Sequence, residues 1–334
     1  MSLVHLLSPS DYMKKAADAA RNANHHIYVL SLVFADHKET RGFIAELEAA
    51  ARRGVKVVVT ADVFTYGEVN SGFLPFRYYS RGAAPTNKMV RSLKRAGVRF
   101  SWLGRGRLTF FNGRTHSKWT VIDDTVFSFG GVNIYNNGIT NTDYVFELSD
   151  ARLAERLIQE QTRILKAEWR TNSNYPSTVY QHPLMDVLLD GGIIGQSIIY
   201  RRACELARQA SHIVFVSQYC PTGRLARILK KKPTEFYYNR TNQAHGLNRF
   251  VIGLSQYVSG LSTAYTGKAY LHAKCIIYTM PDGSKRAISG SHNFAYTGVL
   301  LGTREIALET SAPKIIRQLE AFYRSLAPKD RDAS

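Results

Sequence analysis

Short apolar stretches alternate with amphipathic stretches of helix length in the first sixty residues. The runs at 27–34 and 55–60 are apolar and rich in β-branched residues, which predicts buried strands. The stretches 12–24 and 39–53 have helical periodicity, and Gly54 after the second one is a typical helix stop. This alternation predicts an α/β fold in which helices flank a parallel or mixed sheet.

The same order of elements returns in the second part of the chain. After residue 190 the pattern predicts a helix over 195–210, a strand over 212–217 and a helix over 223–232. A later apolar run at 271–278 matches the run at 115–122 in its pattern of residues. We interpret this recurrence as an internal duplication.

The duplication predicts two similar halves joined by a connecting segment. We assign residues 1–170 to the N-terminal half and 191–334 to the C-terminal half. Residues 171–190 are the predicted connection, because this region is rich in Asn, Ser, Tyr and Pro. Helical stretches at 151–168 and 312–326 close the two halves.

A chemical motif occurs once in each half. The first copy reads His116-x-Lys118, with Asp123 further on and Gly-Gly-x-Asn133 after it. The second reads His272-x-Lys274, followed by Gly-Ser291-x-Asn293. Residues two apart in a strand share a face, so each histidine and its lysine should project together. Two such halves facing each other would gather these residues around one cavity.

Two histidines with lysine and asparagine neighbours are suited to cleaving a phosphodiester bond. One neutral imidazole can attack phosphorus while the other, protonated, gives a proton to the leaving oxygen. The lysines and asparagine amides would stabilise the non-bridging oxygens. The cationic side chains replace a metal ion in this scheme, so we expect neither a metal nor another cofactor.

The spaced motif, present twice, resembles that of the phospholipase D superfamily, and the resemblance covers most of the chain. It implies two halves related by a pseudo-twofold axis, each a mixed sheet flanked by helices, with the active site at their interface. The catalytic residues it implies are His116, Lys118, Asn133, His272, Lys274 and Asn293. The supporting residues it implies are Asp123, Asp143, Ser291 and Glu305.

The second copy departs from the family pattern at one position. Thr279 stands where the motif has an aspartate, the counterpart of Asp123. This departure indicates that Asp123 supports the fold and does not react. In the family, an acid on the strand after each asparagine hydrogen-bonds a catalytic histidine, and Asp143 and Glu305 match those positions.

The second motif and the residues 97–100 are similar to those of the lipid synthases of this superfamily. The branch contains cardiolipin, phosphatidylserine and phosphatidylglycerophosphate synthases. The resemblance therefore implies a phosphatidyltransferase or phospholipase that forms a covalent phosphohistidine. The alternatives are a nuclease of the same superfamily and an inactive relative that binds lipid or nucleic acid.

The net charge of +18 predicts a polyanionic partner. We expect a phospholipid substrate and an anionic membrane surface, with nucleic acid as the alternative and no obligatory protein partner. The predicted membrane contacts are two aromatic runs flanked by arginines: 73–79 with Arg77 and Arg81, and 108–111 between Arg105/Arg107 and Arg114. The run 230–232 is interpreted only as favourable charge at a helix end.

The sequence also predicts a location. The three cysteines have no paired spacing, which is typical of a reducing compartment. The N-terminal residues lack a signal-peptide apolar core, and no stretch has the roughly 18 apolar residues of a spanning helix. We therefore expect a cytoplasmic protein that contacts the inner membrane face peripherally.

Overall fold

The computed structural model describes residues 4–71, 77–105, 113–169, 174–244 and 246–326 of the chain. It divides into two compact units, which are described separately below. The first unit comprises Met1–Ser128, Val132–Thr140 and Tyr144–Asn174, and the second comprises Phe129–Gly131, Asn141–Asp143 and Tyr175–Ser334. Two short segments of the N-terminal half, 129–131 and 141–143, thus belong to the second unit.

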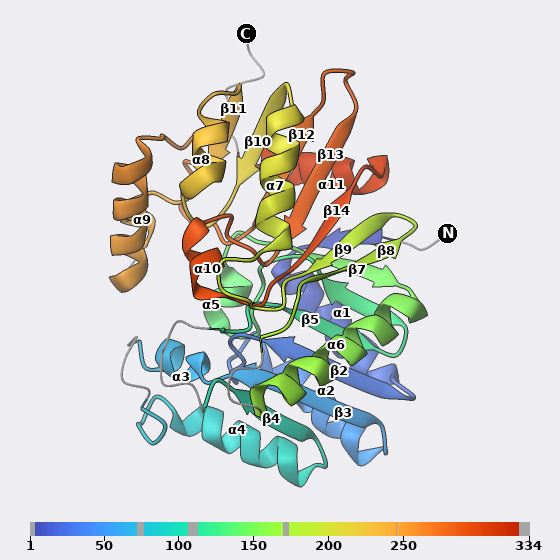
Figure 1. The fold of residues 1–334 in the computed structure, drawn as a ribbon. Helices are drawn as coiled ribbons and strands as arrows, with labels where there is room; N and C mark the ends of the chain where they lie inside the picture. Colours follow the sequence, from blue (N-terminus) through green and yellow to red (C-terminus); the bar gives the residue numbers. More distant parts are fainter. Residues whose placement is uncertain (1–3, 72–76, 106–112, 170–173, 245, 327–334) are drawn as a thin grey trace. The chain divides into compact units, whose positions relative to one another are not determined.

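The first unit is built on a seven-stranded mixed sheet (Figure 1). Its strand order is β1-β7-β6-β5-β2-β3-β4, in which β2, β3 and β4 are parallel and all other neighbours are antiparallel. The strands are β1 (Val4–Leu7), β2 (His26–Ser31), β3 (Lys56–Asp62), β4 (Arg99–Leu103), β5 (Trp119–Ile122), β6 (Thr125–Ser128) and β7 (Val145–Ser149). The helices are α1 (Pro9–Asn22), α2 (Arg41–Arg52), α3 (Phe64–Val69), α4 (Ala84–Arg95), α5 (Asn136–Thr140) and α6 (Ala151–Trp169).

Helices cover both faces of this sheet. Neighbouring residues of β5 point to opposite faces, as strand geometry requires. Trp119 Nε1 donates a hydrogen bond to Gln161 of α6 (2.9 Å), whereas Thr120 Oγ1 shares one with Tyr12 of α1 (2.7 Å). All four residues of β5 are buried. Burial on both faces explains why the central strands are continuous apolar runs without polar alternation.

The second unit contains another seven-stranded mixed sheet, of order β11-β10-β12-β13-β14-β9-β8 (Figure 1). Its strands are β8 (Thr178–His182), β9 (Met185–Leu189), β10 (His212–Val216), β11 (Thr234–Tyr237), β12 (Cys275–Thr279), β13 (Lys285–Gly290) and β14 (Ile306–Thr310). Its helices are α7 (Ile198–Gln209), α8 (Gly223–Leu229), the 3-10 helix η1 (Thr241–Gln243), α9 (Gly246–Ser259), α10 (Tyr296–Leu301) and α11 (Pro313–Arg324).

The two units repeat one pattern of strand pairing. In the first, β2 pairs in parallel with β3 and antiparallel with β5; in the second, β10 pairs in parallel with β11 and antiparallel with β12. The hairpin series β5-β6-β7 likewise corresponds to β12-β13-β14. The predicted fold class, two α/β halves each with a mixed sheet flanked by helices, is confirmed.

The segment 171–190, predicted as a connection, contains β8 and β9. These strands pair as an antiparallel hairpin, and β9 pairs with β14 as β1 pairs with β7. The repeat of the first unit's pattern therefore starts at β9. β8 is an edge strand in which Val179 and Gln181 are exposed. Because such a strand is partly solvated, it contains many polar residues, and its composition resembles that of a loop.

Candidate active site

Each His-x-Lys pair lies in the extended segment directly before a central strand. β5 and β12 begin immediately after Lys118 and Lys274, four residues later than the strands predicted from sequence. The lysines themselves hold these segments. Lys118 Nζ donates to the carbonyl oxygen of His116 (2.6 Å), and Lys274 Nζ donates to that of His272. Both lysines are buried, and their hydrogen bonds hold an amino group beside the backbone of each histidine.

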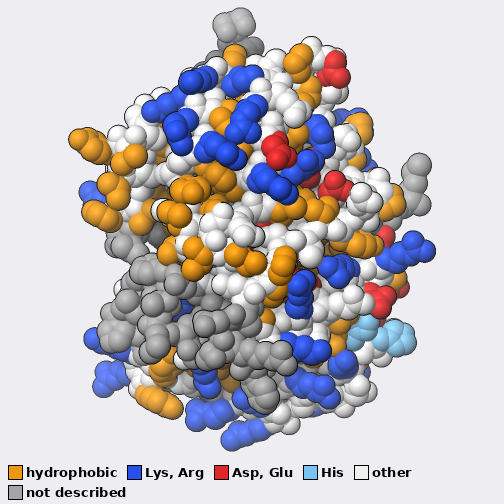
Figure 2. All heavy atoms as spheres, viewed as in Figure 1, with side chains coloured by type: hydrophobic (Ala, Val, Ile, Leu, Met, Phe, Trp, Pro, Cys, Tyr) orange, Lys and Arg blue, Asp and Glu red, His pale blue; other side chains and the backbone are white. Residues whose placement is uncertain are grey.

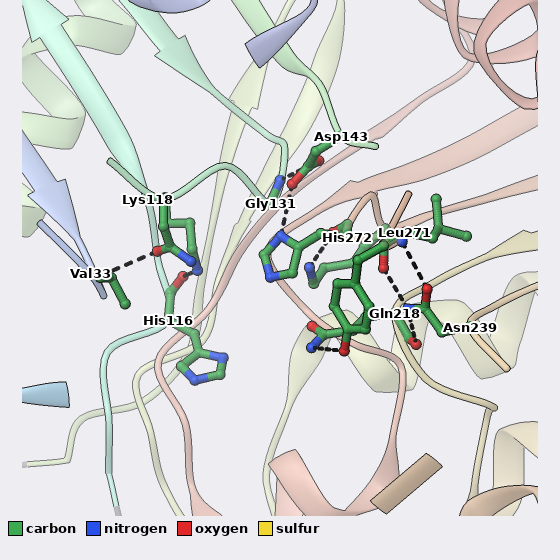
Figure 3. Close-up of polar contacts among 12 residues, drawn as sticks. Val33, His116, Lys118, Gly131, Asp143, Gln218, Asn239, Leu271 and His272 are labelled. Carbon is green, nitrogen blue, oxygen red and sulfur yellow. Dashed lines mark hydrogen bonds and ion pairs between the residues drawn. The ribbon is translucent and has the colours of Figure 1, made fainter. Parts of the chain in front are cut away.

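The second histidine is held by an acid from the N-terminal half of the sequence. His272 Nδ1 lies 2.8 Å from Asp143 Oδ2, and the Asp143 side chain is fully buried (Figure 3). Asp143 belongs to one of the segments that join the second unit. Backbone bonds fix it there: His272 N donates to the carbonyl of Thr142 (2.9 Å), and Thr142 N donates to that of Tyr270. The geometry places Asp143 as the residue that orients His272.

Gly131 allows this approach because it has no side chain. Its N–H donates to Asp143 Oδ1 (3.2 Å; Figure 3). A Cβ atom at Gly131 would lie 2.5 Å from the carbonyl oxygen of His272 and 2.8 Å from Lys274 Nζ. The glycine of the first motif therefore makes room for the histidine and lysine of the second.

The carboxylate contact determines which nitrogen of His272 carries the lone pair. A carboxylate accepts hydrogen bonds, so Nδ1 is the protonated nitrogen when the imidazole is neutral. The lone pair then resides on Nε2. The imidazole side chain retains 15% of its accessible surface. His272 thus has the tautomer and the partial exposure of a nucleophile or general base.

Ser291 positions the second candidate acid. Ser291 Oγ donates to Glu305 Oε2 and accepts from the backbone N–H of Ile306 (3.0 Å). Both Ser291 and Glu305 are buried. The structure therefore brings these two predicted supporting residues together within the second unit.

The two motif asparagines lie in the segments that follow β6 and β13. Asn133 is buried, and its Oδ1 accepts a long bond from the N–H of Val33 (3.4 Å). The carbonyl oxygen of Asn293 accepts from Ser217 Oγ (2.9 Å). The first asparagine lies in the first unit with His116 and Lys118, and the second lies in the second unit with His272 and Lys274.

Asp123 joins two loops at the opposite end of β5 from the lysine. Its Oδ1 accepts from the N–H groups of His25 and His26, and its Oδ2 from that of Asn24, all at 2.9 Å. Burial alone would raise the pKa of Asp123, but these three bonds hold it below its ordinary value. In the second unit the carbonyl oxygen of Thr279 accepts from Ser211 N and Oγ. A backbone carbonyl thus secures the equivalent junction, which explains how the family aspartate could be replaced there.

Sequence reasoning did not find Asn239, which fixes the backbone next to His272. Asn239 Nδ2 donates to the carbonyls of Leu271 (2.7 Å) and Gln218, while its Oδ1 accepts from Leu271 N (2.8 Å; Figure 3). The side chain is fully buried. Asn239 follows two tyrosines and belongs to no recognisable sequence motif. Its role is therefore visible only in the folded structure.

Arg114, predicted to flank a membrane-contacting loop, is instead buried. Its guanidinium pairs with Asp62, which ends β3, and the two side chains are 5% and 1% exposed. Burial raises the pKa of Asp62 to about 6, against the opposing effect of Arg114. The pair secures the chain two residues before His116. The predicted loop residues 73–76 and 108–111 lie outside the described part of the chain.

A second buried acid, Asp190, joins β9 to the N-terminus of α7. It accepts hydrogen bonds from Ser197 Oγ, Ile198 N (2.7 Å) and Ser177 Oγ (3.2 Å). Burial raises its pKa to about 7 in spite of these donors, and Glu305 adds to the increase. Its carboxyl group therefore titrates near neutral pH.

We expect Asp190 to make the free energy of unfolding fall as pH rises from about 4 to about 7. The folded chain binds this proton more tightly than the unfolded chain, so the stabilisation is complete below the unfolded pKa and is lost through about 7. A shift of this size corresponds to at most about 4 kcal/mol. Urea unfolding at several pH values should show a shallower decline for Asp190→Asn. Asp62 titrates in the same range and stays in the variant, so some decline should remain; an unchanged slope would contradict the assignment.

Comparisons with known proteins agree with the sequence motif. Residues 17–165 match the family model described as "Cardiolipin synthase, PLD-like domain". A search of the curated proteins finds no match. The structure resembles phosphatidylserine synthase of Haemophilus influenzae Rd KW20 with a TM-score of 0.70 and 15% identity, over 96% of this chain and 85% of that one. It also resembles polyphosphate kinase from Porphyromonas gingivalis, with a TM-score of 0.61 and 13% identity, over 96% of this chain and 49% of that one.

The matched segment contains the first His-x-Lys motif and its Gly-Gly-x-Asn sequence. The second unit repeats both the motif and the strand pairing of the first. The structural likeness extends the fold over nearly the whole chain. Residues 17–165 are therefore similar to the PLD-like domain of cardiolipin synthases.

Proposed function

We propose that this protein is a phosphatidyltransferase or phospholipase D-type enzyme, similar to cardiolipin synthase, that acts on phospholipid phosphodiesters. The observation that carries the proposal is the His-x-Lys motif present twice, together with the hydrogen bond by which Asp143 orients His272. The family model that matches residues 17–165 and the likeness to a phosphatidylserine synthase both favour a lipid substrate.

In the proposed reaction His116 and His272 act on one phosphate, at a site formed by both halves. One imidazole attacks phosphorus through Nε2, and an N–P bond forms while the P–O bond to the leaving alcohol breaks. The other histidine enters as imidazolium and gives its proton to the leaving oxygen. The product of this step is a phosphatidyl-histidine and a free alcohol.

The second step reverses the first with another alcohol or with water. The histidine that gave up its proton now takes one from the acceptor hydroxyl. The acceptor oxygen attacks phosphorus, and the N–P bond breaks. Transfer to an alcohol gives a new phospholipid, and transfer to water gives phosphatidate.

Charge on the phosphoryl oxygens is stabilised by side chains in this proposal. Lys118 and Lys274 are buried and already oriented by the histidine carbonyls, so little reorganisation is needed when charge develops. The amides of Asn133 and Asn293 add donors. Asp143 stabilises the positive charge that His272 acquires when it is phosphorylated or protonated.

The test supplies phospholipid and nucleic acid to the same purified protein. Vesicles of phosphatidylglycerol, or of a nucleotide-activated diacylglycerol with serine or glycerol phosphate as acceptors, should give a new phospholipid or phosphatidate by mass spectrometry. A single-stranded oligonucleotide is the second substrate. Strand cleavage without any lipid product would replace the proposal with the nuclease alternative.

A further inference from the structure

The helix α9 exposes a continuous apolar face. Phe250, Leu254, Tyr257 and Val258 are 66%, 52%, 88% and 69% exposed. Their spacing of i, i+4, i+7 and i+8 places them on one side of the helix. The opposite side is buried, with Ile252 fully covered. Such a contiguous set is unlike the scattered apolar residues of an ordinary surface.

A groove runs beside this face. It has a volume of about 630 Å³ and is lined by Thr241, Arg249, Phe250, Gly253, Leu254 and Tyr257. Its walls are mostly apolar, with one cation, Arg249. The chemistry fits a chain-like apolar group with an anion at one end.

The surroundings of α9 are strongly basic. Between residues 221 and 260 the sequence has seven Lys or Arg (224, 227, 230, 231, 232, 240 and 249) and one acid, Glu235. All except Lys232 are exposed cations, while Lys232 Nζ donates to the carbonyls of Arg208 and Ala210 at the end of α7. Figure 2 shows hydrophobic side chains over α9 at the left edge and Lys and Arg side chains above them, over α7 and α8.

We propose that α9 is the element by which this chain docks on an anionic lipid bilayer. Its apolar face enters the interface, and the exposed cations around it pair with lipid phosphates. A second copy of the chain is a poor occupant, because a twofold contact through α9 would bring two basic regions together. Aliphatic Leu254 and Val258 offer nothing to stacked bases, which disfavours nucleic acid.

The docking helix is connected to the segment that holds His272. Gln256 Nε2 donates to the carbonyl oxygen of Asn239 (3.3 Å). The Asn239 side chain in turn hydrogen-bonds both the N–H and the carbonyl oxygen of Leu271. Docking through α9 therefore engages the same part of the unit that carries one catalytic histidine. This link to catalysis rests on the proposed function, whereas the proposal that α9 docks on a bilayer does not.

The variant that tests the surface replaces Phe250, Leu254, Tyr257 and Val258 by Ser. All four side chains are exposed, so we expect normal folding. Binding to vesicles of equal parts phosphatidylglycerol and phosphatidylcholine, measured by co-sedimentation, should weaken about tenfold or more. Wild-type binding should keep a residual at high salt that the variant lacks, since apolar insertion is not screened. Vesicles of phosphatidylcholine alone should bind both proteins poorly.

The matched control replaces exposed apolar residues outside both α9 and the predicted membrane-contacting runs, Val179 and Ile194, by Ser. This double variant should bind vesicles like the wild type. Equal binding by the α9 variant and the wild type would overturn the proposal. So would a wild-type dimer that the α9 variant converts to monomers while vesicle binding persists. Loss of oligonucleotide binding with vesicle binding retained would also overturn it.

Failure of this inference can be told apart from failure of the proposed function. If lipid is turned over and the α9 variant still binds vesicles, α9 is not the docking element but the function stands. If no lipid product forms, yet the α9 variant loses vesicle binding, the surface stands and the function fails. If both hold, the α9 variant should lose turnover of vesicle lipid while keeping turnover of a short-chain lipid below its micelle concentration.

Discussion

Replacing either His116 or His272 by Ala is expected to reduce turnover by at least about 10⁴-fold. The two imidazoles act as nucleophile and proton donor in one displacement, so the loss of either removes the same step. The double variant should therefore be no less active than the worse of the two single variants. Steady-state turnover of phospholipid, or of whichever phosphodiester the protein accepts, measures this directly.

A change of leaving group should separate the two roles. With an activated diester such as bis(p-nitrophenyl) phosphate, the leaving oxygen needs no proton. The variant that lacks the general acid should then recover most of its first-step rate, whereas the variant that lacks the nucleophile should not. The covalent phosphohistidine should be stable to base and labile to acid.

Folding controls are needed because His272 hydrogen-bonds a buried carboxylate. His272→Ala leaves Asp143 with the Gly131 N–H but without its imidazole partner, which should lower stability. Thermal unfolding identifies any such loss. His5→Ala, which removes an exposed histidine on β1, should leave turnover unchanged. Equal activity of His116→Ala and His5→Ala would exclude His116 from the reaction.

The sequence predicts the repeated α/β pattern because its central strands are buried on both faces. Strands such as β3 and β10 contain continuous apolar runs, at 57–59 and 213–216, so composition alone identifies them. β8 is an edge strand with alternating exposure, and its polar residues were interpreted as a connection. The apolar face of α9 has helical spacing, yet the sequence does not show that this face is left uncovered.

The candidate site shows a similar division between local and long-range information. His116, Lys118, His272 and Lys274 are identifiable because their spacing is local. Asp143 could be named from its place after the motif, but its partner is 129 residues away in the sequence, and only the backbone pairing of Thr142 brings it there. Asn239 and the pair Asp62–Arg114 depend entirely on tertiary contacts, so no spacing in the sequence indicates them.

The two aspartates of the first half should respond differently to the same substitution. Asp143→Asn keeps the size of the side chain but removes the charge that stabilises a cationic His272. We expect about a 10²- to 10⁴-fold loss of kcat with little change in stability.

Asp123→Asn should instead cost stability and spare catalysis. Oδ1 of the new amide could still accept from His25 and His26, but its NH₂ group would face the N–H of Asn24, two donors with no acceptor. The expected loss is about 1–3 kcal/mol in the free energy of unfolding at neutral pH. Because the pKa of Asp123 is lowered, its contribution should be present above about pH 4 and lost as pH falls further. Along an extended strand, five residues place it about 16 Å from Lys118, too far to contact the phosphate.

Chemical denaturation and kcat measured on both variants decide the matter: a folded Asp123→Asn protein as inactive as His116→Ala would make Asp123 part of the catalytic machinery and refute its structural role.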